Sequence, residues 1–265
     1  MFVSSAEKIY GQTSAIRVAL ALVVLVVLGI IAAVYYDNTM QTFENTFWMI
    51  AAIVAAAYIA TCVLIGKTKL AIHPEGVRYT SAFGEKELLW HDIKETRYQV
   101  TPIHVGAHFG LIGMAVQAYA TRQGKSSTVS QKLTLIGQDG SKIKITSNFS
   151  NAKEAISIIL GKIVPPLVAD MKRRIQNGEI IQFGSVSVSL AGVRWKSKDA
   201  VAFSDIKKAE IAGQMLRIGK QGKWLDYVAV RCHKVPDVVA LLEVIKTFTP
   251  VQSAGVLDPL EHVRV

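Results

Sequence analysis

Cysteine and charge are both scarce in this sequence. Only Cys62 and Cys232 are present among 265 residues, which excludes a disulfide framework, and both are expected to be reduced thiols in a cytoplasmic setting. Charged residues make up 19% of the chain and hydrophobic residues 51%, an apolar composition that suggests membrane segments. The charges that remain sum to +10, which favours an anionic partner such as a membrane surface or nucleic acid.

The motifs that identify common enzymes are missing as well. The chain contains no G-x-S-x-G, H-E-x-x-H, P-loop or C-x-x-C pattern. His104 and His108 stand four apart, as two metal ligands on a helix would, but Gly106 and Gly110 disfavour a helix there and no third ligand is nearby. We therefore predict no enzyme, no cofactor and no metal site, and a hydrolase or metal enzyme using these histidines is the weakest alternative.

Two stretches of the chain lack charge altogether. Residues 18–36 and 47–66 are charge-free, and as helices rising ~1.5 Å per residue each would reach the ~30 Å of a bilayer core. A cleaved signal peptide, the rival interpretation of the first run, would have a shorter apolar stretch. Basic residues flank only the outer ends of the pair, and the link 37–46 has none, so both termini are expected in the cytoplasm. The sequence thus predicts a two-pass transmembrane helical hairpin over residues 16–66 (helices 16–36 and 47–66) in a bacterial inner (plasma) membrane.

The rest of the chain contains an internal repeat. Three short motifs recur in the same order: GVRY at 76–79 and GVRW at 192–195, WHDIK at 90–94 and FSDIK at 203–207, and IGQDG at 136–140 and IGKQG at 218–222. The second copy has lost three residues between its first two motifs. Three anchors in the same order indicate two versions of one small domain.

Each copy is expected to consist of short strands followed by an apolar helical pattern. Alternation at 142–146 is typical of a half-buried strand, and the helical spacings fall at 152–163, at 167–176 beyond Pro165-Pro166, and at 238–247. Strands closed by one C-terminal helix, twice over and behind a hairpin, resemble the bacterial pleckstrin-homology-like (PH-like) membrane proteins. The resemblance implies an α+β fold with an N-terminal transmembrane helical hairpin followed by two tandem antiparallel β-roll or barrel PH-like domains, each closed by a C-terminal helix.

The charge-free runs and the repeat, together with this resemblance, give the expected domain boundaries. The predicted parts are a cytoplasmic N-terminus at 1–15, the hairpin at 16–66, a first PH-like domain at 67–178 with an apolar insertion at 100–130, a second PH-like domain at 179–250, and a C-terminal tail at 251–265. PH-like families largely serve as lipid- or protein-docking modules, so the resemblance implies docking rather than catalysis.

Two groups of residues are candidate contact sites. The insertion has no Asp, Glu, Lys or Arg between residues 100 and 121, so it is expected either to contact a membrane or a partner or to pack on its own domain. The residues predicted for that contact are His104, Val105, Phe109, Leu111, Ile112 and Met114. Basic residues predicted to face an anionic surface are Lys172, Arg173 and Arg174, together with Arg194, Lys196 and Lys198 on one face of a strand.

These observations predict a membrane-anchored docking or scaffold protein. Its cytoplasmic PH-like domains would bind a protein partner or the anionic leaflet, as a homo-oligomer or with another chain in the membrane. The alternative is an accessory structural subunit of a larger membrane protein complex. Nucleic acid is not expected, because no aromatic–basic interleaving or recognition helix appears, and no small-molecule substrate is inferred.

Overall fold

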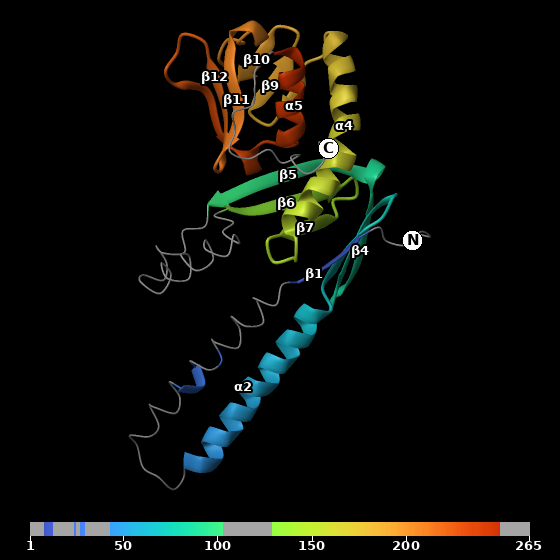
Figure 1. The fold of residues 1–265 in the computed structure, drawn as a ribbon, viewed down its shortest axis with the longest axis vertical. Helices are drawn as coiled ribbons and strands as arrows, with labels where there is room; N and C mark the ends of the chain where they lie inside the picture. Colours follow the sequence, from blue (N-terminus) through green and yellow to red (C-terminus); the bar gives the residue numbers. More distant parts are fainter. Residues whose placement is uncertain (1–7, 13–23, 25–26, 30–42, 103–128, 250–265) are drawn as a thin grey trace. The chain divides into compact units, whose positions relative to one another are not determined.

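The computed structural model describes residues 8–12, 24, 27–29, 43–102 and 129–249, which form a mixed α/β chain (Figure 1). Within these ranges the strands form four small antiparallel sheets, in the orders β1-β2-β3-β4, β5-β6-β7, β8-β9-β10 and β11-β12-β13. The chain divides into two compact units, residues 1–88 with 148–151, and residues 89–147 with 152–265. The domain boundaries predicted above stay a prediction.

The first unit combines one long helix with a four-stranded sheet. Its elements are β1 (Lys8–Gly11), α2 (Phe43–Gly66), β2 (Lys69–Ile72), β3 (Gly76–Ser81) and β4 (Gly84–Leu89). β1 pairs antiparallel with β2, and β2 with β3. The sheet buries Leu70, Ile72 and Val77, and Phe149 lies against it with its ring edge-on to Tyr79.

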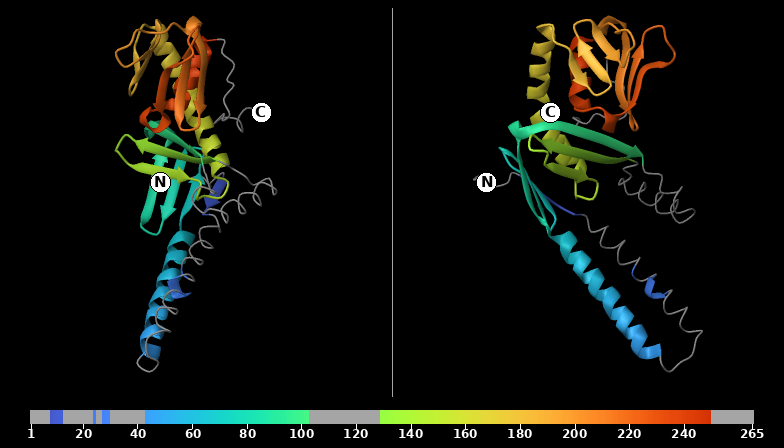
Figure 2. Two further views of the ribbon diagram at one scale, coloured as in Figure 1. Left: turned by 90° about the vertical axis from the view of Figure 1, so that its left-hand side faces the viewer. Right: turned by 180° about the vertical axis from the view of Figure 1, so that it is seen from behind.

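The second unit holds the other three sheets and two helices. Its elements are η1 (Trp90–Asp92), β5 (Ile93–Pro102), β6 (Val129–Gly137), β7 (Lys142–Thr146), α4 (Ala152–Gln176), β8 (Ile181–Phe183), β9 (Val186–Ser189), β10 (Gly192–Trp195), η2 (Phe203–Asp205), β11 (Ile206–Ala212), β12 (Met215–Lys220), β13 (Asp226–Arg231), η3 (Cys232–Lys234) and α5 (Val238–Phe248). Helices α4 and α5 contact each other, drawn in yellow and red in Figure 2.

Alternation of apolar and polar residues explains how these sheets form. In β7 the buried Ile143 and Ile145 alternate with exposed or half-exposed neighbours, because successive side chains of a strand point to opposite faces. Helix α5 buries Val238, Leu241 and Ile245 on one side, as helical spacing requires. Near its end the ring of Phe248 stacks on Phe203 of η2, with centroids 4.9 Å apart.

The repeat seen in the sequence reappears as matching hydrogen bonds. In the first copy the backbone N–H of Gln138 donates to the carbonyl of Asp92 at 2.9 Å, and its side-chain amide donates to the carbonyl of His91 at 3.2 Å. In the second copy Gln221 makes the same two bonds, to Asp205 at 2.7 Å and to Ser204 at 3.1 Å. Within each copy, the hairpin that carries the glutamine is therefore hydrogen-bonded to the 3₁₀ turn of the same copy.

Helix α4 differs from its prediction. It runs unbroken from Ala152 to Gln176 through Pro165 and Pro166, whereas two separate helices were expected. Two adjacent prolines remove two backbone hydrogen bonds, a local loss. Ile163 and Val164 before the prolines and Met171 after them are buried. This burial holds both halves of α4 within the second unit and offsets that loss.

The predicted transmembrane hairpin is wrong. Among the described residues there is no helix long and apolar enough to cross a membrane. Freedom from charge is not the same as strong hydrophobicity: Leu, Ile, Phe and Val favour insertion most, and most of the 24 residues of α2 are of other types. Of the predicted helix 16–36, only residues 24 and 27–29 are described.

The fold class and the location inferred from that hairpin are corrected with it. A two-pass inner-membrane protein is not supported, and neither are the PH-like rolls that the resemblance implied. Short meanders followed by a helix suit many α+β arrangements, so their order along the chain does not specify a PH-like roll. What the structure supports is coarser, a mixed α/β fold with several small antiparallel sheets.

Candidate partner-binding surface

One group of predicted contact residues falls in the insertion. His104, Val105, Phe109, Leu111, Ile112 and Met114 all lie outside the described residues. Their contact with a partner or a membrane stays a prediction.

The basic cluster on α4 is largely neutralised by its own neighbours. Arg173 and Arg174 both form ion pairs with Asp170, and Arg174 also donates from Nε to Glu179 at 2.8 Å. The hydrogen bond to Glu179 raises the pKa of Arg174. Lys172 is half-buried between these pairs. A cluster that already holds two carboxylates is a weak site for a further anion.

The basic cluster after β10 lacks such neighbours. Arg194 is exposed on β10, and Lys196 and Lys198 are exposed in the turn that follows. In the described part of the chain, no carboxylate lies within ion-pair distance of these three cations. Lys196 takes a left-handed conformation, with φ of 55°, so the chain leaves the strand there and the three cations do not share one strand face as predicted.

Aromatic rings lie under the two lysines. The Nζ of Lys198 is 4.5 Å from the ring centroid of Trp195 and 5.7 Å from that of Tyr227, and the Nζ of Lys196 is 5.2 Å from Trp195. Cations at such distances are attracted by the negative faces of the rings. The Tyr227 hydroxyl donates to the carbonyl of Asp199 at 2.5 Å and accepts from the backbone N–H of Trp195 at 3.2 Å. Tyr227 therefore fixes the turn that carries the lysines.

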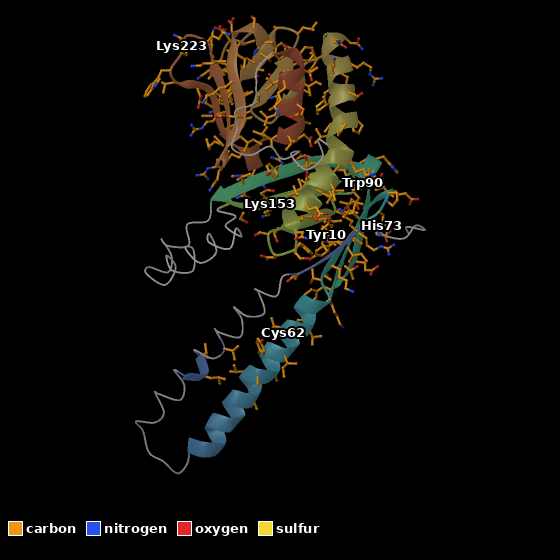
Figure 3. All side chains as sticks on the ribbon, viewed as in Figure 1. Tyr10, Cys62, His73, Trp90, Lys153 and Lys223 are labelled. Carbon is orange, nitrogen blue, oxygen red and sulfur yellow. The ribbon has the colours of Figure 1, made fainter. Side chains whose placement is uncertain are left out.

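The hairpin between β12 and β13 carries exposed apolar side chains a few residues before Tyr227. Trp224 is 96% exposed and Leu225 73% exposed, and Lys223, labelled in Figure 3, is exposed next to them. They precede Tyr227 by only two to four residues, so the chain keeps them within about 14 Å of it. We call Arg194, Trp195, Lys196, Lys198, Lys223, Trp224, Leu225 and Tyr227 the basic–aromatic surface.

Gly192 sets the backbone geometry beneath this surface. Its φ is 116°, and a Cβ at this position would overlap the carbonyl of Val201. The close approach lets Val193 and Val201 exchange two backbone hydrogen bonds, of 2.9 and 2.8 Å. Only glycine combines that φ with that distance, so it determines where the turn with Lys196 and Lys198 returns to the strand.

The sequence contained part of the signal for this surface. Arg194, Lys196 and Lys198 were identified, but Trp224 and Leu225, which precede the strand that begins at Asp226, were not. Gly222, with φ of 68°, marks the loop that places both residues at its tip. Two large apolar residues one position beyond this glycine were the sequence signal for the surface.

Two observations concern nucleophilic and metal-binding side chains in the described ranges. Burial raises the pKa of the Cys232 thiol to about 11, so it is protonated near neutral pH and a poor nucleophile. No group of three or more His, Cys, Asp or Glu side chains in those ranges could hold a metal ion.

The structure thus defines a mixed α/β chain of small antiparallel sheets with an exposed basic–aromatic surface. The chain matches the family of unknown function DUF6585 over residues 4–253 and belongs to that family. No curated protein matches it.

Proposed function

We propose that this protein is a docking protein whose basic–aromatic surface binds an acidic segment of a protein partner. The observation that carries the proposal is that cations without an ion pair among the described residues occur together with exposed aromatic and aliphatic side chains. Arg, Trp and Tyr are enriched among the residues that dominate binding at protein interfaces. An exposed Trp beside an exposed Leu keeps apolar area in water, and a partner would remove that area.

The arrangement of acids favours a short acidic segment over nucleic acid. Asp199 follows Lys198 in the turn after β10, and Asp226 begins β13 just after Lys223, Trp224 and Leu225; both carboxylates lie at least partly exposed. A continuous phosphate backbone crossing the surface would meet these carboxylates, whereas a folded or extended peptide can place single acids opposite single cations.

A peptide titration with the full chain tests this proposal. The probe is a twelve-residue peptide of Glu and Leu, the matched probe has Lys in place of Glu, and a DNA duplex is the third ligand. We expect the Glu peptide alone to bind with a salt-dependent affinity, and the triple variant Arg194→Ala, Lys196→Ala, Lys198→Ala to lose about tenfold or more.

The α4 cluster supplies the control variant for that titration. Arg173→Ala with Arg174→Ala removes two cations that already hold Asp170 and Glu179, so the affinity should change less than about twofold. Equal losses in both variants would reduce the effect to net charge. Tighter binding of DNA than of the Glu peptide would assign the surface to nucleic acid instead.

A second candidate function is an accessory structural subunit of a larger assembly, and one observation favours it. The apolar side chains Ile53 and Ile59 of α2 are each 61% exposed, and Val63 and Leu64 are also exposed. Apolar side chains on one helix are commonly covered by another chain in the assembled state. Native mass of the gently purified protein distinguishes the candidates, because a subunit co-purifies with other chains in fixed ratio.

A further inference from the structure

The second unit contains a cavity of about 410 Å³ that the basic–aromatic surface does not use. Its walls come from η1, β5, the middle of α4 and the start of α5. Apolar groups of Ile93, Ile163, Pro166 and Leu167 form much of the lining, and Trp90, labelled in Figure 3, also contributes. Cavities of this size are typical of sites for small molecules.

Two of the three carboxylates that line the cavity are already paired. Glu95 accepts a hydrogen bond from the guanidinium of Arg97 on the same strand. Asp170 forms its ion pairs with Arg173 and Arg174. Asp237 is the third, and no cation lies within ion-pair distance of its carboxylate in the parts of the chain that the structure describes.

Asp237 is held firmly in place at the start of α5. Its backbone is left-handed, with φ of 48°, and its N–H donates to the carbonyl of Thr96 at 2.9 Å. The backbone N–H and the hydroxyl of Thr96 both donate to Oδ1 of Asp237, at 2.8 and 2.9 Å. Its Oδ2 receives no hydrogen bond from any described residue. Asp237 lines the cavity, and one oxygen of its fixed carboxylate has no hydrogen-bond donor among the described residues.

Burial makes this carboxylate costly to ionise. The pKa of Asp237 is raised, mainly because burial removes water from the charged form, and Glu95 raises it further. The hydrogen bonds from Thr96 and the charge of Arg97 act in the opposite direction. A cation placed at Oδ2 would replace the lost solvation.

We propose that this cavity binds a small primary amine with an apolar body. Its ammonium donates to Oδ2 of Asp237, and its hydrocarbon part lies against Ile163, Pro166 and Leu167. The cavity is large enough to hold a chain of six carbons. Lys94 and Lys162 also line the cavity, but both are exposed, so water screens their charges.

Three six-carbon probes test the proposal by calorimetry on the full chain: hexylamine, 1-hexanol and hexanoate. We expect hexylamine to bind about tenfold or more tightly than 1-hexanol, and hexanoate to bind most weakly. In Asp237→Asn the amide oxygen still accepts from Thr96, so the fold is kept while the charge is lost. The preference for hexylamine over 1-hexanol should then fall below about twofold, with 1-hexanol unchanged.

A second variant keeps the test valid if Asp237→Asn disturbs folding. Leu167→Trp is at a half-buried cavity wall, and its larger side chain should abolish binding of both hexylamine and 1-hexanol. Equal affinities of the amine and the alcohol for the unaltered protein, or no binding of any probe, would overturn the proposal. Tightest binding of hexanoate would overturn it too, since Lys94 and Lys162 would then be the determinants.

Discussion

The strands β3 and β10 carry almost the same four residues in different surroundings. In β3 the half-buried Arg78 donates from Nε to Glu87 at 2.6 Å, and Tyr79 packs edge-on against the buried Phe149. In β10 the exposed Arg194 has no carboxylate partner among the described residues, and Trp195 lies under lysine ammonium groups. One motif therefore serves packing in the first copy and an exposed surface in the second.

The difference comes from the strand that follows. In the first copy β4 lies beside β3 and supplies Glu87. In the second copy the chain returns after β10 only as the single bridge of Val193 with Val201, with no strand in the place of β4. Without a strand in that place, Arg194 has no counterpart of Glu87 among the described residues. Partners, more than the motif itself, decide what a repeated strand does.

Gly192→Ala, at the first residue of β10, is expected to have the largest effect on stability. A Cβ here overlaps the carbonyl of Val201 and the φ of 116° is unfavourable for alanine, so we expect a loss of about 3 kcal/mol or more. Gly222→Ala is the control, because its Cβ meets nothing and only the φ of 68° costs, about 1 kcal/mol. Urea unfolding measures both, and equal losses would show that the contact with Val201 is unimportant.

Thr96→Ala makes the first copy resemble the second, in which Ala209 occupies the equivalent position. The hydroxyl of Thr96 bonds to the carboxylate of Asp237, so its removal should destabilise the protein by about 2 kcal/mol. Thr101→Ala on the same strand is the matched change, expected to cost less than about 0.5 kcal/mol. Indistinguishable unfolding midpoints for the two variants would contradict a structural role for the bond.

The pH dependence of stability tests the effect of burying the Asp237 carboxylate. Because the pKa of Asp237 is raised on folding, the folded state binds more protons between the ordinary value of 3.8 and the raised value. This group should therefore make the protein less stable as pH rises through that window. Relative to Asp237→Asn, the unaltered protein should be most stable at the acidic end. An unfolding midpoint difference that is constant with pH, or that grows with pH, would contradict the assignment.

The smallest expected change in stability comes from comparing the surroundings of Arg78 and Arg194. Glu87→Gln removes the charge that Arg78 contacts on a half-buried pair, so we expect a loss of about 1 kcal/mol. Arg194→Gln should change the free energy of unfolding by less than about 0.5 kcal/mol, since Arg194 has no ion pair with any described residue. A larger loss for Arg194→Gln than for Glu87→Gln would reverse the comparison.

Local patterns in the sequence predicted much of the strand and helix content. The alternation at 142–146 predicted β7 with its bounds, and the apolar spacing from Val238 predicted α5 to within one residue. The three repeated motifs also include the positions at which Gln138 and Gln221 make matching hydrogen bonds. The strand and helix predictions succeeded because each is decided by neighbours along the chain.

Features that depend on distant or competing contacts were missed. The charge-free run in α2 was interpreted as a membrane span, although the helix is not apolar enough, and Pro165-Pro166 was interpreted as a break that tertiary packing overrides. The cavity at Asp237 joins residues more than 140 positions apart through Thr96, a distance that no local pattern reports. Neutralisation of Arg173 by Asp170, three residues earlier, could have been predicted from helical spacing.

The central claim is that the basic–aromatic surface docks an acidic protein segment, and photo-crosslinking from its tip tests this most directly. A photo-reactive phenylalanine analogue replaces Trp224 in one protein and Phe83, 92% exposed at the β3–β4 turn, in the other. From position 224 we expect a protein adduct whose crosslinked segment is rich in Asp and Glu. That adduct should disappear with Arg194→Ala, Lys196→Ala, Lys198→Ala and be absent from position 83. Adducts to neutral or basic segments, or equal yields from both positions, would contradict the account.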